Sequence, residues 1–354
     1  MVTSEQALKI KAFKAEMNKK LVKDGHRPLI LGSEIYVPPC QTSGILSLDV
    51  ALGGGWANNR WIEVVGEASS SKTTTILHTI ATNQALRDDY SVYWLASEPY
   101  NPDWAALNGI DNDRVVVDET NNMELGFQGV INAARSHSFD CIVIDSYPAL
   151  IADAEADKTM EEFSMASGAR RVGQFFRKIT DSFTDDRPYI GFFVNQYRDN
   201  IGGYSPHGTP KTEPGGKAKN YNFYQRVKIS RDDWVTESRE GLGKVPVGQT
   251  TKYQITKNKQ GAPQRTAAAD MYFDYTEGGF KPGQYDAVKD IITMGVLFKV
   301  IERGGGGMFY YTPIGATERL GWKGRDVMVE AIRDNIELRE EIMRLTLEIA
   351  TNKD

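Results

Sequence analysis

A short loop between an apolar run and a helical pattern carries the residues whose spacing most clearly permits chemistry. Residues 61–65 form a candidate strand, apolar except for Glu63, and the sequence Gly-Glu-Ala-Ser-Ser-Ser-Lys-Thr follows them directly. This is the pattern G-x-x-x-x-G-K-[ST], with Ser71 at the second glycine position. The backbone N–H groups of such a loop point at a polyphosphate, and the helix N-terminus behind it adds a positive dipole. The pattern therefore predicts a site for ATP.

Two residues of this loop have defined roles in the pattern. Lys72 is expected to reach the β- and γ-phosphates, and the Thr73 hydroxyl is expected to ligate Mg²⁺. Ser71 weakens the match, because the glycine it replaces often takes a backbone conformation that other residues adopt reluctantly. The predicted ATP-binding residues of the loop are Gly66, Glu67, Ala68, Ser69, Ser70, Ser71, Lys72, Thr73 and Thr74.

Two further apolar runs lead into carboxylates. Residues 141–145 end in Asp145, which is expected to hold Mg²⁺ together with Thr73 at the carboxyl end of a strand. Residues 92–96 lead to Glu98, which is placed to polarise a water that attacks the γ-phosphate. Either acid taken alone also fits a strand cap or a surface position. Their order after Lys72 favours an ATPase that uses ATP and Mg²⁺.

The elements that must position these residues read as a mostly parallel α/β sheet. The early apolar runs lack polar alternation, as expected for strands that are covered on both faces, and helical patterns between them complete βαβ units. The later runs follow one another with little helix between them, which predicts an antiparallel extension of the same twisted sheet. The candidate strands lie at residues 61–65, 92–96, 114–117, 141–145, 189–194, 226–230, 252–256 and 271–275.

The two ends of the chain differ from this core. Residues 4–22 have the periodicity of an amphipathic helix and are followed by a linker with Gly and Pro. After residue 279 the pattern changes to a small hairpin, with strands near 297–300 and 308–311, and then to one or two helices over 325–349. We therefore expect an N-terminal helix and linker for subunit docking (1–38), a P-loop ATPase core (39–278) and a small α+β domain (279–354).

Composition excludes several classes of protein. The 354 residues are 40% hydrophobic and 25% charged, which is ordinary for a globular chain. The sequence has no apolar stretch long enough for a membrane span, no secretory signal pattern, and only Cys40 and Cys141, so we expect a cytoplasmic protein. The net charge of −5 neither supports nor excludes DNA binding, because a local basic face is sufficient.

Together these motifs resemble those of bacterial and phage RecA recombinases. The run Thr-Ser-Gly-Ile-Leu-Ser-Leu-Asp-Val-Ala-Leu-Gly at 42–53 matches the family's approach to the ATP loop. The resemblance is clear over residues 40–275 and looser in both flanks. It implies that Glu98 is the catalytic glutamate, that Trp104 stacks on adenine, and that Gln196 senses the γ-phosphate. It also implies that Lys257 and Lys259 act catalytically across the subunit interface on the neighbour's ATP.

The resemblance implies two DNA loops as well, at about 157–165 and 200–214. Ile201 and Tyr204 are candidates for contact with bases, and Lys219 is a further candidate for phosphate contact. Ser71 and the segment 219–222 depart from the family pattern, which indicates a divergent relative, with a phage-encoded one among the options. The DNA-binding residues implied by the resemblance are Met165, Arg170, Arg177, Arg198, Ile201, Tyr204, Gly215, Gly216, Lys217 and Arg226.

The function implied is a DNA-dependent ATPase that forms filaments on single-stranded DNA and promotes pairing and strand exchange with homologous duplex DNA, in recombination and repair. The N-terminal helix is expected to dock on the adjacent subunit, and the location is the cytoplasm, that of the host for a phage protein. Two alternatives stay open. One is a ring-forming RecA-like motor, against which Glu98 and the Lys257 and Lys259 pair argue. The other is a non-enzymatic regulator that binds nucleotide or DNA, for which Ser71 is the best argument.

Overall fold

The computed structural model describes residues 4–26, 28–156, 166–183, 186–199 and 211–351. The chain divides into two compact units, Met1–Pro38 and Pro39–Asp354. The first unit contains helix α1 (Ser4–Lys23) and the 3-10 turn η1 (Gly32–Glu34). Asn18 makes two hydrogen bonds to the backbone of Leu29, and Lys14 pairs with Glu34. The segment after α1 therefore runs back along the helix, as expected for a helix with its own linker.

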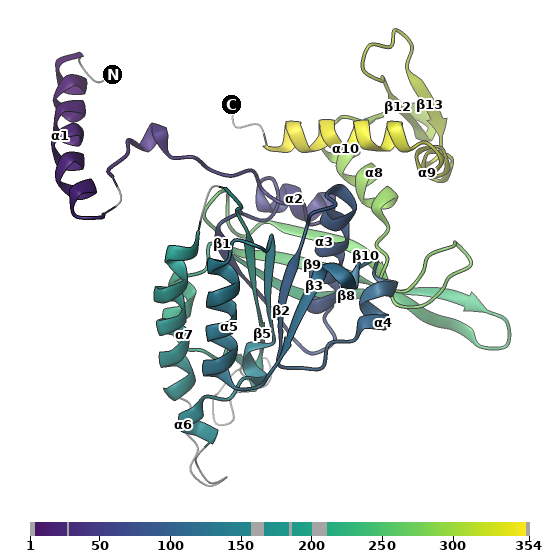
Figure 1. Cartoon of the computed structure of the whole chain (residues 1–354). Helices are drawn as coiled ribbons and strands as arrows, with labels where there is room; N and C mark the ends of the chain where they lie inside the picture. Colours follow the sequence, from purple (N-terminus) through teal and green to yellow (C-terminus); the bar gives the residue numbers. More distant parts are fainter. Residues whose placement is uncertain (1–3, 27, 157–165, 184–185, 200–210, 352–354) are drawn as a thin grey trace. The chain divides into compact units, whose positions relative to one another are not determined.

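The second unit is built on an eight-stranded sheet with the order β10-β9-β8-β1-β5-β4-β2-β3 (Figure 1). All pairs from β8 to β3 are parallel, and β8–β9 and β9–β10 are antiparallel. This confirms the predicted α/β fold, a mostly parallel sheet with an antiparallel extension. The strands are β1 (Arg60–Gly66), β2 (Val92–Ala96), β3 (Val115–Glu119), β4 (Cys141–Asp145), β5 (Ile190–Gln196), β8 (Gln225–Arg239), β9 (Gly243–Asn258) and β10 (Thr266–Tyr272).

Helices cover both faces of the parallel part of the sheet. In β2, Trp94 joins the core beneath α2 (Leu46–Leu52) and α3 (Lys72–Leu86). Its neighbours Tyr93 and Leu95 join the opposite core, beneath α5 (Met123–Arg135) and α7 (Ala166–Ile179), which lie side by side in Figure 1. Because side chains of a strand alternate between faces and both faces are buried, these strands show no polar alternation in sequence.

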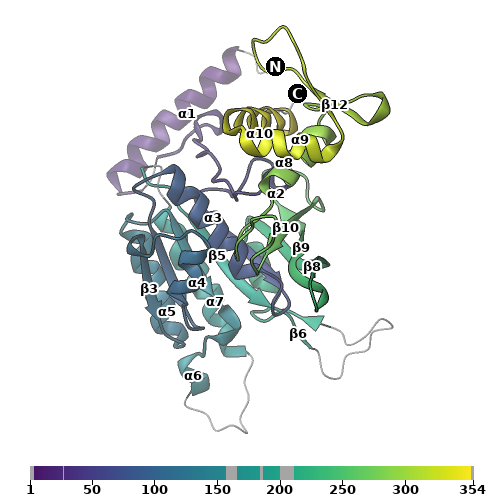
Figure 2. The same ribbon diagram turned by 90° about the vertical axis from the view of Figure 1, so that its right-hand side faces the viewer.

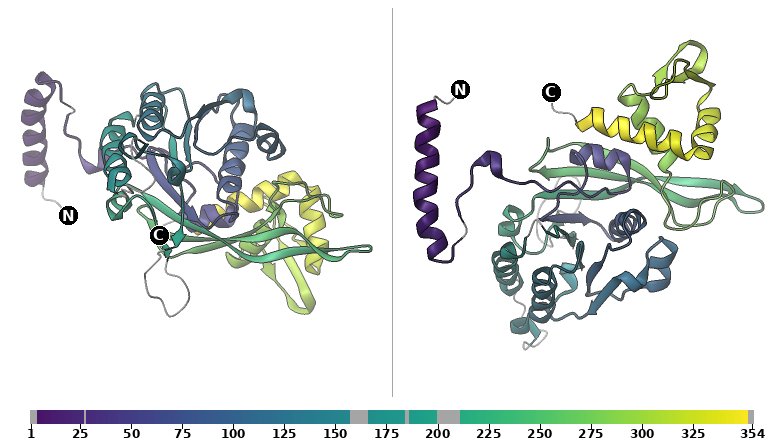
Figure 3. Two further views of the ribbon diagram at one scale, coloured as in Figure 1. Left: turned by 90° about the horizontal axis from the view of Figure 1, so that it is seen from below. Right: turned by 45° about the horizontal axis from the view of Figure 1, so that its top comes forward.

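Strands β8 and β9 are far longer than their sequence pattern indicated. They contain 15 and 16 residues and extend past their neighbours as a two-stranded hairpin (Figures 1 and 3). Only their inner halves are buried, and these correspond to the runs expected at 226–230 and 252–256. The outer halves are largely exposed and mostly polar, with Trp234 as an exposed exception, and carry no periodic signal. The last strand of this sheet was expected at 271–275 but is Thr266–Tyr272, so the prediction overlaps it at only two residues.

The C-terminal part packs three helices around one side of α2. Helix α8 (Ala287–Leu297), α9 (Arg325–Asp334) and α10 (Ile336–Thr351) share a core with Leu46 and Val50 of α2, and Figure 2 shows these helices together. A three-stranded sheet lies beside them: β11 (Glu302–Arg303), β12 (Met308–Tyr311) and β13 (Leu320–Lys323). The strand expected at 297–300 was wrong, because Leu297 is the last residue of α8 and Phe298 is its C-cap.

Short elements complete the described part of the second unit. They are α4 (Pro102–Leu107), α6 (Asp153–Ala156), β6 (Arg198–Asp199), β7 (Lys211–Thr212) and the 3-10 turns η2 (Asn112–Arg114), η3 (Tyr147–Ala149), η4 (Thr180–Ser182), η5 (Lys217–Tyr221) and η6 (Gly305–Gly307). Strands β6 and β7 pair with each other and join residues on either side of 200–210. Among the described residues, none of the helices has both the length and the apolar character needed to cross a membrane.

Candidate nucleotide and DNA site

Four parallel strands bring the predicted nucleotide-binding residues to one edge of the sheet. Gly66 at the end of β1 lies opposite Gln196 at the end of β5, and Ala96 at the end of β2 lies opposite Asp145 at the end of β4. Glu98 follows β2 by two residues. Because ligands of open α/β sheets bind beyond the carboxyl ends of the strands, this edge is where a nucleotide is expected.

The loop between β1 and α3 has the backbone conformation that its motif predicts. A Cβ atom at Gly66 would lie 2.3 Å from the carbonyl oxygen of Ile229 on β8, so only glycine permits this close approach. Ser71 has φ 68° and ψ 24°, the left-handed region that usually belongs to glycine. The serine therefore adopts the conformation of the residue it replaces, and α3 begins immediately after it, at Lys72.

Lys72 supplies a buried cation at the start of α3. Its side chain folds over the loop, where Nζ donates a hydrogen bond to the carbonyl oxygen of Glu67 at 2.5 Å, and the residue is 6% exposed. Burial lowers the pKa of Lys72, and the negative charges of Asp145, Glu98 and Glu67 oppose that shift. An anion in this loop would add a favourable partner for the ammonium group.

Thr73 and Asp145 present two oxygen donors side by side. Thr73 Oγ1 donates a hydrogen bond to Asp145 Oδ2 at 2.9 Å. The pKa of Asp145 is raised to about 6, because burial and the nearby Glu98 charge raise it more than the Thr73 hydrogen bond and the Lys72 charge lower it. Hydroxyl and carboxylate oxygens suit Mg²⁺. The described residues contain no cluster of three or more His, Cys, Asp or Glu that could hold a metal ion, so phosphate oxygens and waters would complete the ligand set.

Glu98 and Gln196 are in direct contact. Glu98 Oε1 accepts hydrogen bonds from Ser146 Oγ at 2.7 Å and from Gln196 Nε2 at 3.3 Å. The acid at the end of β2 and the amide at the end of β5 therefore form one unit that faces the phosphate loop. Sequence reasoning missed Ser146, although its position directly after Asp145 was the available signal.

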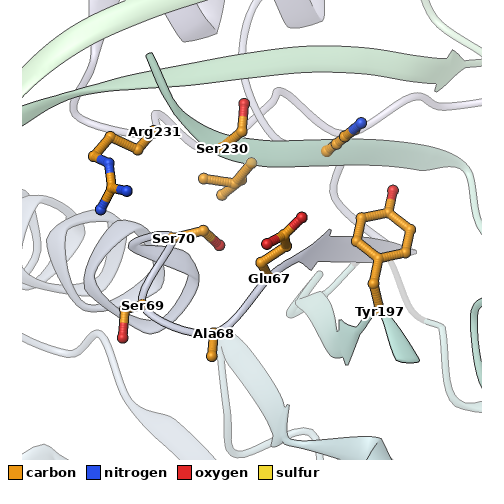
Figure 4. Close-up of a pocket in the computed structure, with 9 residues that line it drawn as sticks. Glu67, Ala68, Ser69, Ser70, Tyr197, Ser230 and Arg231 are labelled. Atoms are coloured by element: carbon orange, nitrogen blue, oxygen red, sulfur yellow. The ribbon is translucent and has the colours of Figure 1, made fainter. Parts of the chain in front are cut away.

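The outer flank of the loop faces β8. Figure 4 shows Glu67, Ala68, Ser69 and Ser70 opposite Ser230 and Arg231 of β8 and Tyr197, around a cavity of about 240 Å³. Lys211 of β7 pairs with Glu67. This ion pair ties the residue that follows segment 200–210 directly to the phosphate loop, a link that the sequence did not indicate.

Lys257 and Lys259 lie away from the phosphate loop of their own chain. Lys257 of β9 pairs in the sheet with Arg226 of β8, which in turn pairs with Glu63 in the middle of β1. Nζ of Lys257 donates a hydrogen bond to the carbonyl oxygen of Asn220 at 2.6 Å. The backbone N–H of Lys259 donates to the carbonyl oxygen of Tyr224, and the N–H of Tyr224 donates to the carbonyl oxygen of Trp61, near the start of β1. At about 3.3 Å per residue, that point is about 16 Å along the strand from Gly66. Lys257 is thus level with the middle of β1, about 10 Å along the strand from Gly66, and Lys259 is near the start of β1, at the end away from the loop.

Trp104 lies on α4, which Asn101 caps through a 2.9 Å hydrogen bond from the Trp104 N–H. The ring is partly buried against the core beneath α3. Its stacking on adenine stays a prediction.

Nine of the ten predicted DNA residues divide into three groups. Arg198, Gly215 and Gly216 line a cavity of about 550 Å³ together with the first residues of α7. Arg170 and Arg177 are exposed two turns apart on α7. The remaining positions, Met165, Ile201 and Tyr204, lie outside the described residues, as does the side chain of Lys217, and both predicted loops fall largely in the same segments.

A buried ionic cluster occupies two positions that were expected to contact phosphates. Lys219, 1% exposed in its side chain, pairs with Glu63 and Glu213, and Arg226 pairs with the same two carboxylates at 2.5 Å. Asn195 Nδ2 donates to Glu63 at 2.9 Å. The phosphate contact expected of Lys219 was wrong, because Nζ is enclosed. Arg226 is engaged in the same cluster, which favours a structural role for its guanidinium.

Comparison with known proteins places these features in a family. The RecA N-terminal domain family matches residues 11–278. A protein named RecA from Pseudarthrobacter chlorophenolicus is 32% identical over 346 residues, covering 97% of this chain and 91% of the relative. RecA of Clostridium tetani is 31% identical over 302 residues, covering 85% and 80%, and RecA of Bacillus anthracis is 32% identical over 302 residues, covering 85% and 81%.

Proposed function

The chain belongs to the RecA family, and from that premise we propose that it is a DNA-dependent ATPase that forms helical filaments on single-stranded DNA. Within the filament it promotes pairing and strand exchange with homologous duplex DNA, in recombination and repair, in the cytoplasm. The observation that carries this proposal is the convergence of Lys72, Thr73, Asp145, Glu98 and Gln196 at one edge of the sheet. A chain that only bound nucleotide would have no chemical use for Glu98 in that position.

The roles of these residues follow from their positions. The loop N–H groups and Lys72 bind the phosphates of ATP, and Thr73 and Asp145 hold Mg²⁺, which supplies charge neutralisation on the phosphate oxygens. Glu98 accepts a proton from the attacking water, since its carboxylate lies beyond the end of β2 and is held by Ser146. Trp104 stacks on the base.

Hydrolysis is completed by a second copy of the chain. Lys257 is level with the middle of β1 and Lys259 with its start, so both are set back from their own loop and are available to the ATP site of a neighbour. Two cations entering from a neighbour would stabilise the transition state as an arginine finger does. A head-to-tail contact of this kind propagates as a helix when the rotation does not close, and α1 supports it by docking on the adjacent subunit.

ATP and DNA communicate through the end of β5. Gln196 contacts Glu98 on one side, and β5 continues through β6 into segment 200–210 on the other. A γ-phosphate that contacts Gln196 would shift the conformational equilibrium of that segment, as it does in nucleotide switches. Arg198, Arg170 and Arg177 then contribute phosphate contacts to the DNA strand.

The test is ATP hydrolysis with and without single-stranded DNA, in the native chain and in Glu98→Gln. We expect strong stimulation by DNA, and a loss of about 100-fold or more in the variant, because it removes the general base while leaving ATP binding intact. Glu119→Gln, at the exposed end of the neighbouring strand β3, is the matched control and should hydrolyse normally. An equal rate of hydrolysis with and without DNA would contradict the proposed recombinase function and favour a ring-forming motor. Absence of hydrolysis in every condition would favour a regulatory binder.

A further inference from the structure

Ser71 departs from its motif, and the structure provides a specific partner for the departure. The residue holds a left-handed backbone, with φ 68°, that L-amino acids rarely adopt. Its Oγ accepts a hydrogen bond from Nε2 of Gln249 at 2.6 Å. Gln249 lies on β9, 178 positions further along the chain, and is 3% exposed. A glycine at position 71 would leave this buried amide without that hydroxyl.

The contact belongs to a face of β9 that supports the start of α3. Gln249, Thr251 and Tyr253 alternate along the strand, so their side chains share one face, and all three are buried. Tyr253 OH lies 3.3 Å from Thr75 Oγ1 in the first turn of α3, and Gln249 Nε2 lies 3.5 Å from Thr251 Oγ1. The first residue before α3 and its first turn therefore both rest on hydrogen bonds from β9.

We infer that Gln249 is a positioning residue for ATP binding, which acts by holding Ser71 in the left-handed conformation. That conformation orients the N–H groups of the loop toward the phosphates, and a serine needs the hydrogen bond to keep it, whereas a glycine adopts it unaided. Gln249 does not itself touch the nucleotide. The inference rests on the proposed function, because it concerns the same ATP site.

The test is a double-substitution cycle on four full-length chains: native, Gln249→Met, Ser71→Gly and the two combined. Methionine preserves the length of glutamine but removes the amide. A fluorescent ATP analogue with Mg²⁺ reports the dissociation constant, and urea unfolding without nucleotide reports the unfolding midpoint. Gln249→Met should weaken binding about five-fold in the native background, the effect of one ordinary hydrogen bond, and less than about two-fold in the Ser71→Gly background.

Gln254→Met is the matched control, since Gln254 lies on the same strand and contacts Gln264 at 3.4 Å instead of the loop; its affinity for the analogue should equal that of the native chain. An equal loss of affinity in both backgrounds would overturn the inference, as would a lower unfolding midpoint with no change in affinity. Both outcomes leave the proposed ATP site intact. No binding by any of the four chains would overturn the proposed function and the inference together.

Discussion

At the scale of single residues, the cluster around Glu63 shows that burial gives Lys219 a structural role in place of a contact with phosphate. Glu63 lies on β1 three residues before the phosphate loop and is completely buried. Lys219, Arg226 and Asn195 all direct donors to its carboxylate. The cluster joins β1, β5, β8 and η5, so it fixes the base of the nucleotide site to the segment that returns from 200–210.

Lys219→Met tests this structural role. Removing one partner leaves Glu63 and Glu213 less well compensated in a buried place, so we expect a loss of about 3 kcal/mol in the free energy of unfolding, measured with urea. Lys252→Met is the control, because Lys252 pairs with Asp232 at 3.6 Å on an exposed part of β9. Its loss should stay within about 0.5 kcal/mol. Equal losses in the two variants would contradict the buried cluster.

Sequence reasoning brought the motif residues to one edge of the sheet, and it failed for residues that depend on distant contacts. The loop, Asp145 and Glu98 were found because a strand end fixes where its next residues lie. Lys219 was misread, since nothing in its neighbourhood of the sequence reveals Glu63, 156 positions earlier. Gln249 was missed for the same reason.

At the scale of elements, the contact between α8 and α2 contains a buried carboxyl. Asp290 of α8 accepts a hydrogen bond from the backbone N–H of Ser47 at 3.0 Å. The pKa of Asp290 is raised from 3.8 to about 6. Burial is the main cause and the charge of Asp49 adds to it, while the Ser47 hydrogen bonds act in the opposite direction. The folded chain therefore keeps this proton to a higher pH than the unfolded chain does. The protonated carboxyl of Asp290 therefore contributes to the stability of the folded chain. This contribution is fully present below about pH 4 and is lost as the pH rises through about 6.

Asp290→Asn should accordingly stabilise the chain at about pH 7.5, by up to about 3 kcal/mol, because it removes a buried charge and keeps an acceptor for Ser47. The advantage over the native chain should shrink steadily as the pH falls to about 4.5. Urea unfolding at about pH 7.5, 6 and 4.5 measures this difference. Asp334→Asn, at an exposed position of α9, is the control. A difference between Asp290→Asn and the native chain that stays constant with pH would refute the argument.

Elements were predictable from sequence where burial was complete. Strands β2 and β4 were placed at their observed limits, because five consecutive buried residues give an unbroken apolar run. The hairpin of β8 and β9 was half missed, since its outer part is held by backbone pairing between exposed polar residues and not by burial. The end of α8 and the residues after it, 297–300, were predicted as a strand, because so short an apolar stretch does not separate the two periods.

At the scale of the whole molecule, the two groups of residues proposed to act on ATP lie apart in one chain. The loop, Asp145 and Glu98 are at the carboxyl edge of the sheet. Lys257 is level with the middle of β1, about 10 Å from Gly66 along the strand, and Lys259 is near its start, about 16 Å away. A rigid sheet cannot bring them together within a subunit. If both groups are needed, hydrolysis must occur between two chains.

Mixing two inactive variants tests this directly. One carries Lys257→Ala with Lys259→Ala, and the other carries Glu98→Gln, so neither alone should show DNA-stimulated hydrolysis. In an equal mixture, a contact between two neighbouring chains, here called a junction, is complete when the ATP site comes from the first variant and the lysines come from the second. Random assembly with head-to-tail contacts makes about one quarter of the junctions complete, so the mixture should recover about one quarter of the native rate. Steady-state ATP hydrolysis on single-stranded DNA measures it, with each variant mixed with itself as the control. A mixture no more active than its components would mean that the lysines act elsewhere than at the neighbour's ATP.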